Sequence, residues 1–258
     1  MADLVVVERE SGVGWITIDH PPANALSWAV IAGVREGLRE LEADPKVGAA
    51  VLTGRGDRFF VAGADIGEFV SDGPERTHAK IADGQQLTLE MERSRLPIMA
   101  AINGFALGGG LELAMACDLR MASSSAKLGQ PEILLGLIPG WGGTQRLPRL
   151  VGRGRALELL LSGDRIDAER ALELGLVNRL SDPSTLREEA QELAQRLAER
   201  APLAVAATKR AVSRGLDRPL DEGLEAELVE FDAAFRSEDA AEGIAAFLAK
   251  RAPTWSGR

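Results

Sequence analysis

Short apolar segments separated by turn residues fill the first half of the chain. Leu4–Arg9 and Val13–Asp19 have the length and composition of two strands joined by a turn at Gly12. The turn sequences between the later apolar segments indicate that each of these is a strand of its own. Further strands are predicted at Val47–Thr53, Phe59–Ala62, Ile98–Ile102, Leu119–Ala122 and Lys127–Gly129.

Helical spacing appears between these strands. Ser27 can cap a helix in which Trp28, Ile31, Leu38 and Leu41 share one face. Two further helices are predicted at Glu75–Ser94 and Gly108–Ala116. The order strand, strand, helix therefore recurs, which predicts a layered α/β core built from repeated turns rather than a doubly wound sheet.

After Trp141 the pattern becomes almost entirely helical. Two apolar stripes at helical spacing stand out, and each must be buried against the core or against another subunit. We therefore expect a core carrying the active site over residues 1–195 and a helical region over 196–258. The stripes are Leu186, Ala190, Leu193, Ala194 and Leu197, followed by Leu220, Leu224, Leu228, Phe231 and Phe235.

Composition and charge narrow the range of possible partners and sites. The 258 residues carry a net charge of −9, which disfavours nucleic acid as a partner. A single cysteine, Cys117, excludes an internal disulfide and a cysteine metal cage, and His20 and His78 lack metal-ligand spacing. We expect no metal site. No signal peptide and no apolar run of about 18 residues is present, so we expect a cytoplasmic protein without a membrane partner.

Two glutamates lie in apolar surroundings near the middle of the chain. Glu112 follows three glycines, and Glu132 stands in Gly129-Gln130-Pro131-Glu132-Ile133. An ionised carboxylate is costly in such surroundings unless it is paired or functional. Two of them can share acid and base work on one substrate. The alternative is that each is an ordinary solvated or salt-bridged residue.

Two glycine-containing segments can offer backbone N–H groups. In Gly63-Ala64-Asp65-Ile66 the small residues allow a ligand to approach the backbone closely. Gly108-Gly109-Gly110 opens a predicted helix, where the first N–H groups have no partner within the helix. One N–H group from each segment could form an oxyanion hole. The alternatives are an ordinary turn and an ordinary helix start, whereas a phosphate loop, a dinucleotide fingerprint and a serine triad fit poorly.

Four segments together resemble the enoyl-CoA hydratase/isomerase family, the crotonases. They are Ala62–Ile66, Asn103–Ala114, Gln130–Glu132 and Ile138–Leu147. The resemblance implies an α/β fold, a crotonase-like spiral of repeated ββα turns with a helical C-terminal trimerisation region. It also implies that Ala64 and Gly109 donate their N–H groups to a thioester oxygen, and that Glu112 and Glu132 are the two catalytic acids and bases.

The resemblance further implies a substrate site. Coenzyme A would lie along the segments that contain Ala23, Asn24, Ala25, Ala62, Asp65 and Ile66. Trp141 would narrow or reshape the acyl pocket. Phe247 and Lys250 would lie near the coenzyme A site of a neighbouring subunit in a trimer or a dimer of trimers. No cofactor is expected, since coenzyme A is part of the substrate.

We therefore expect an enoyl-CoA hydratase acting on an acyl-CoA substrate. The nearest alternative is another crotonase-fold enzyme such as an enoyl-CoA isomerase, which needs only one glutamate. A non-catalytic acyl-CoA-binding protein is disfavoured, because a binder gains nothing from the desolvation cost of two buried carboxylates.

Overall fold

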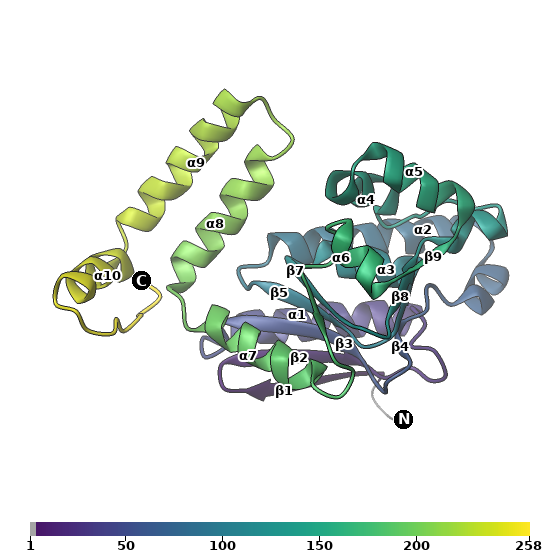
Figure 1. Cartoon of the computed structure of the whole chain (residues 1–258), viewed down its shortest axis with the longest axis horizontal. Helices are drawn as coiled ribbons and strands as arrows, with labels where there is room; N and C mark the ends of the chain where they lie inside the picture. Colours follow the sequence, from purple (N-terminus) through teal and green to yellow (C-terminus); the bar gives the residue numbers. More distant parts are fainter. Residues whose placement is uncertain (1–3) are drawn as a thin grey trace.

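Two β-sheets form the centre of the molecule (Figure 1). This computed structural model describes residues 4–258, apart from the side chain of Phe69. The larger sheet has the strand order β1-β2-β3-β5-β7-β10, and the smaller has the order β4-β6-β8-β9. The larger sheet contains β1 (Val5–Glu10), β2 (Val13–Ile18), β3 (Ala49–Gly54), β5 (Ile98–Ile102), β7 (Leu119–Ser123) and β10 (Arg179–Ser181). The smaller contains β4 (Phe59–Val61), β6 (Phe105–Leu107), β8 (Lys127–Gly129) and β9 (Arg165–Asp167).

After the β1–β2 hairpin and α1, the chain repeats one type of turn that builds both sheets. In each of these turns the first strand joins the larger sheet, the second joins the smaller sheet, and a helix follows. β3 pairs in parallel with β5 and β5 with β7, while β4 pairs in parallel with β6 and β6 with β8. The chain therefore winds as a spiral, which confirms the predicted α/β fold of repeated ββα turns. The helices of this part are α1 (Trp28–Ala43), α2 (Ile66–Arg93), α3 (Gly109–Ala116), the 3₁₀ helix η1 (Pro131–Leu135), α4 (Gly143–Val151), α5 (Arg153–Ser162) and α6 (Ala168–Glu173).

Both faces of the larger sheet are covered, and β2 and β3 are buried along their whole length. Such strands are apolar on both faces, as is usual where helices cover a parallel sheet. Ile16 and Leu52 face the core cluster that includes α1, whereas Trp15 and Val51 face the opposite way. That second face packs against α7 (Leu186–Ala198), whose predicted apolar stripe is confirmed.

Helix α2 differs from the prediction. It begins at Ile66, nine residues before the predicted start at Glu75, because Asp65 caps it by accepting a hydrogen bond of 2.9 Å from the Gly67 N–H. Gly73, with a φ of 72°, and Pro74 kink the helix. In the sequence this pair resembles a helix boundary, since glycine and proline usually end helices. The strands β6, β9 and β10, each three residues long, were also not predicted.

Three helices form an arm beside the sheets (Figure 1). They are α8 (Pro202–Gly215), α9 (Leu220–Phe235) and α10 (Glu238–Leu248). Lys209 ties α8 to the core through an ion pair of 2.7 Å with Asp118 and a hydrogen bond of 2.6 Å to the Leu96 carbonyl. The predicted stripe on α9 stays exposed, from 54% at Leu224 to 78% at Leu220. One chain therefore leaves this stripe uncovered. Whether 1–195 and 196–258 are separate domains stays a prediction.

No helix within the described residues is long and apolar enough to cross a membrane.

Candidate active site

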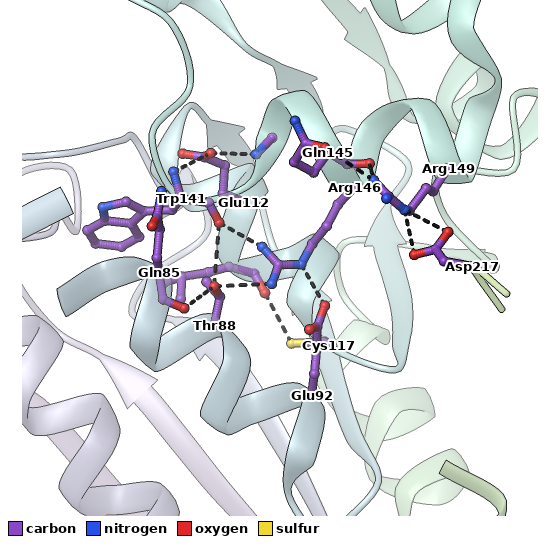
Figure 2. A network of polar contacts seen from close by, with 12 residues as sticks. Gln85, Thr88, Glu92, Glu112, Cys117, Trp141, Gln145, Arg146, Arg149 and Asp217 are labelled. Carbon is purple, nitrogen blue, oxygen red and sulfur yellow. Dashed lines mark hydrogen bonds and ion pairs between the residues drawn. The ribbon is translucent and has the colours of Figure 1, made fainter. Parts of the chain in front are cut away.

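Glu112 lies at the start of α3 and is only 2% exposed. Its Oε1 atom accepts hydrogen bonds from the N–H of Trp141 at 2.7 Å and from the N–H of Gly143 at 2.6 Å (Figure 2). Burial raises the pKa of Glu112 to about 7 and the charge of Glu132 adds to this, although the two N–H groups oppose it. Both hydrogen bonds engage Oε1, so Oε2 is the oxygen available to a water or a substrate.

Glu132 lies on η1 and is half-buried. With its amide nitrogen facing this carboxylate, the fully buried Gln130 donates to Oε1 at 2.9 Å and to Oε2 at 3.1 Å. Burial raises the pKa of Glu132. The φ of 52° at Gly108 favours glycine, and a Cβ there would lie 2.8 Å from Oε1 of Glu132.

Two backbone N–H groups meet beside the carboxylates. Leu26 pairs with Ala64 in an isolated parallel bridge, which holds the turn before α2 against the chain before α1. A Cβ built on Gly109 would lie 3.9 Å from the Ala64 nitrogen, so the two segments are in contact. Within residues 4–258 neither the Ala64 nor the Gly109 N–H has an acceptor. The dipole of α3 adds positive potential at Gly109.

Arg146 on α4 binds the loop that contacts Glu112 (Figure 2). Its guanidinium donates to the Trp141 carbonyl at 2.7 Å, to Glu92 at 2.6 Å and to the Thr88 hydroxyl at 3.2 Å. It thereby holds the loop whose N–H groups bind Glu112, and its charge lowers the pKa of Glu112. Sequence reasoning missed the roles of Arg146 and Gln130, although both stand inside the motifs that carried the resemblance.

The residues predicted for coenzyme A lie around Ala64. The Ala62 N–H donates to the Ala23 carbonyl at 3.1 Å, which joins the two predicted segments. The Asn24 side chain is buried, and its amide donates to the carbonyls of Arg55 and Phe59. Contact between Asn24 and a ligand would therefore use its backbone. Ala25 is half-buried, Asp65 caps α2 and Ile66 is exposed. Their role in binding stays a prediction.

The three remaining predicted residues, Trp141, Phe247 and Lys250, differ in exposure and in position. Trp141 is 3% exposed and packs in the core beside Glu112. Phe247 is 82% exposed and lies in the last turn of α10, close in sequence to the exposed Lys250. Helix α10 lies at the end of the arm, away from α3 (Figure 1). One chain therefore does not bring Phe247 and Lys250 to the two glutamates.

Known proteins share both the sequence and the fold. The family model for enoyl-CoA hydratase/isomerase matches residues 8–258. A probable enoyl-CoA hydratase of Bacillus subtilis is 47% identical over 95% of this chain and 95% of its own length. A crotonyl-CoA hydratase of Syntrophomonas wolfei is 41% identical over 96% of this chain and 95% of its own. A crystal structure of an enoyl-CoA hydratase from Bacillus anthracis has a TM-score of 0.95 at 38% identity, covering 99% of this chain and 100% of that one.

The spiral fold is thus that of enzymes that act on acyl-CoA thioesters. This chain belongs to the enoyl-CoA hydratase/isomerase family.

Proposed function

We propose that this protein is an enoyl-CoA hydratase that converts a trans-2-enoyl-CoA and water into a 3-hydroxyacyl-CoA. The observation that carries the proposal is the pair Glu112 and Glu132, each held by its own N–H donors, beside two N–H groups without acceptors. The names of the relatives from Bacillus subtilis and Syntrophomonas wolfei support hydration.

In the proposed reaction, the water oxygen bonds to C3 of the substrate. Glu112 takes a proton from that water, and Glu132 gives a proton to C2, so water is added without any change in the number of electrons. Negative charge gathers on the thioester oxygen as the C3–O bond forms. The N–H groups of Ala64 and Gly109 stabilise this charge, as donors of an oxyanion hole do. The chemistry needs no metal or redox cofactor, because only protons and a hydroxide equivalent move.

The decisive experiment follows the loss of the enoyl absorbance with crotonyl-CoA. We expect the wild type to hydrate it, and Glu132→Gln to lose about 10²–10⁴-fold in kcat, the usual contribution of a general acid or base. A 3-enoyl-CoA tests the isomerase alternative, which needs only one glutamate. If Glu132→Gln kept isomerisation at the wild-type rate and the wild type hydrated nothing, this protein would be an isomerase.

Arg146 provides an independent test of how Glu112 is held. In Arg146→Met the loop carrying Trp141 and Gly143 loses its clamp, so we expect kcat to fall roughly 10-fold or more, since small displacements at a reacting group are costly. The lost positive charge also raises the pKa of Glu112. Since Glu112 must be ionised to act as a base, the acid limb of the profile of kcat/KM against pH moves to higher pH.

Arg149→Met is the matched control for this test. Arg149 lies on the same helix but is exposed, and it pairs with the exposed Asp217 at 3.0 Å. Its replacement should change neither kcat nor the pH profile. Two results would show that Arg146 does not act on Glu112. One is a pH profile of Arg146→Met whose acid limb is not shifted, and the other is an equal fall in kcat in Arg149→Met.

We also propose that the arm mediates assembly into a trimer or a dimer of trimers. The support is the exposed apolar stripe on α9, including the stacked pair Phe231 and Phe235, since large exposed apolar patches usually mark interfaces. In such an assembly Phe247 and Lys250 can reach a neighbouring active site. Sedimentation velocity tests this directly, and a fully active monomer at micromolar concentration would contradict it.

A further inference from the structure

The indole of Trp141 lies next to Gly109, one of the two proposed oxyanion donors. A Cβ built on Gly109 would lie 3.8 Å from Cε3 of this indole and 3.9 Å from the Ala64 nitrogen, so the ring and the second donor flank the same point. The backbone N–H of the same residue donates to Glu112 at 2.7 Å (Figure 2). The backbone of Trp141 therefore binds Glu112, while its ring packs beside Gly109.

Helix α2 prevents the indole ring from shifting away from Gly109. The ring lies against the backbone of α2 at Gly84, where a Cβ would overlap the indole. The loop behind the ring is fixed as well, since the Gln85 amide donates to the Gly140 carbonyl at 2.7 Å and Arg146 donates to the Trp141 carbonyl at 2.7 Å. With 3% exposure, the side chain is packed like a core residue.

We propose that Trp141 closes the acyl end of this site and restricts the enzyme to short enoyl chains. The inference rests on the proposed hydratase function. With the thioester oxygen at the Ala64 and Gly109 N–H groups and C3 between the two carboxylates, the carbons beyond C3 extend along the wall that Trp141 provides. A chain too long for the space must push against a ring that Gly84 holds in place, and overpacking of this kind is costly.

The expected effect is a steep dependence of kcat/KM on chain length. Each methylene that the ring excludes should lower kcat/KM about 10-fold or more, the usual discrimination of an apolar pocket. We expect the wild type to prefer crotonyl-CoA over trans-2-decenoyl-CoA by about 100-fold or more. Trans-2-hexenoyl-CoA should fall between the two.

The test uses Trp141→Ala and Trp141→Phe in the full-length protein. Both keep the backbone N–H to Glu112, so they change the wall and leave that hydrogen bond in place. Trp141→Ala should lower the ratio of kcat/KM for crotonyl-CoA to that for decenoyl-CoA at least about 10-fold, and Trp141→Phe should lower it less. Trp15→Phe is the matched control, because Trp15 is buried under α7 on the far face of the larger sheet, where it donates to Gln191 at 2.7 Å.

The outcomes separate this inference from the proposed function. If the wild type hydrates no enoyl-CoA of any length, the hydratase function is wrong. If it hydrates crotonyl-CoA and decenoyl-CoA equally well, the function stands and the inference is overturned. A folded Trp141→Phe or Trp141→Ala that loses activity by the same factor on every chain length would also overturn it, because the ring would then be structural only.

Discussion

Glu112→Gln is expected to abolish most hydration and, at the same time, to make the fold more stable above about pH 7. The loss in kcat should be about 10²–10⁴-fold, since in the proposed reaction Glu112 takes the proton from water and glutamine cannot. The gain in stability has a separate cause. Glu112 is 2% exposed, so its carboxylate is almost fully removed from water. Burying this charge lowers the stability of the folded protein.

The direction of this stability effect follows from the pKa of Glu112, which is raised from 4.5 to about 7 in the folded protein. A raised pKa means that the proton favours the folded state. The contribution of Glu112 to stability is therefore greatest below pH 4.5 and is lost as the pH rises through about 7. The shift corresponds to a cost of about 3 kcal/mol for the wild type at higher pH. Glutamine carries no charge, so the variant does not incur this cost.

Urea unfolding at about pH 5 and about pH 8, at matched protein concentration, measures the effect. Glu112→Gln should be more stable than the wild type at the higher pH, and the difference should shrink at the lower pH. Glu173→Gln is the control, because Glu173 is exposed on α6 and pairs with the exposed Arg170. Equal stabilities of Glu112→Gln and the wild type at about pH 8 would mean that the buried charge costs nothing.

Gly109→Pro is expected to lower kcat about 10²–10³-fold, because proline removes one N–H donor from the proposed oxyanion hole. Position 109 is the first residue of α3, where proline is well tolerated. The helix itself should therefore form in the variant.

Gly109→Ala is the matched control, since it adds a Cβ but keeps the N–H. That Cβ would lie 3.1 Å from Cδ1 of the buried Leu26 and 3.9 Å from the Ala64 nitrogen, so Gly109→Ala measures the loss caused by added atoms alone. We expect its kcat to fall less than that of Gly109→Pro, because the alanine variant keeps the N–H donor. Circular dichroism confirms that both variants are folded. If the two lost activity equally, the added atoms and not the missing N–H would be responsible.

Much of the fold follows from local patterns in the sequence. Buried strands such as Val47–Thr53 and the helix capped by Ser27 were predicted because apolar spacing and capping act over a few residues. Helix α2 shows the limit of this reasoning. The predicted start at Glu75 directly follows Gly73 and Pro74, but the Asp65 cap starts the helix earlier and the chain is helical on both sides of the kink.

The sequence by itself determined the ββα order, the family and the candidate carboxylates, because each depends on residue types at short and fixed spacing. Only the tertiary structure decided how those carboxylates are held. The partners of Glu112 lie 29 and 31 residues along the chain, and the clamp on their loop comes from α4. The fit of Trp141 against Gly84 likewise joins residues from different turns of the spiral. Contacts of this kind depend on how whole elements pack, and no local spacing encodes that.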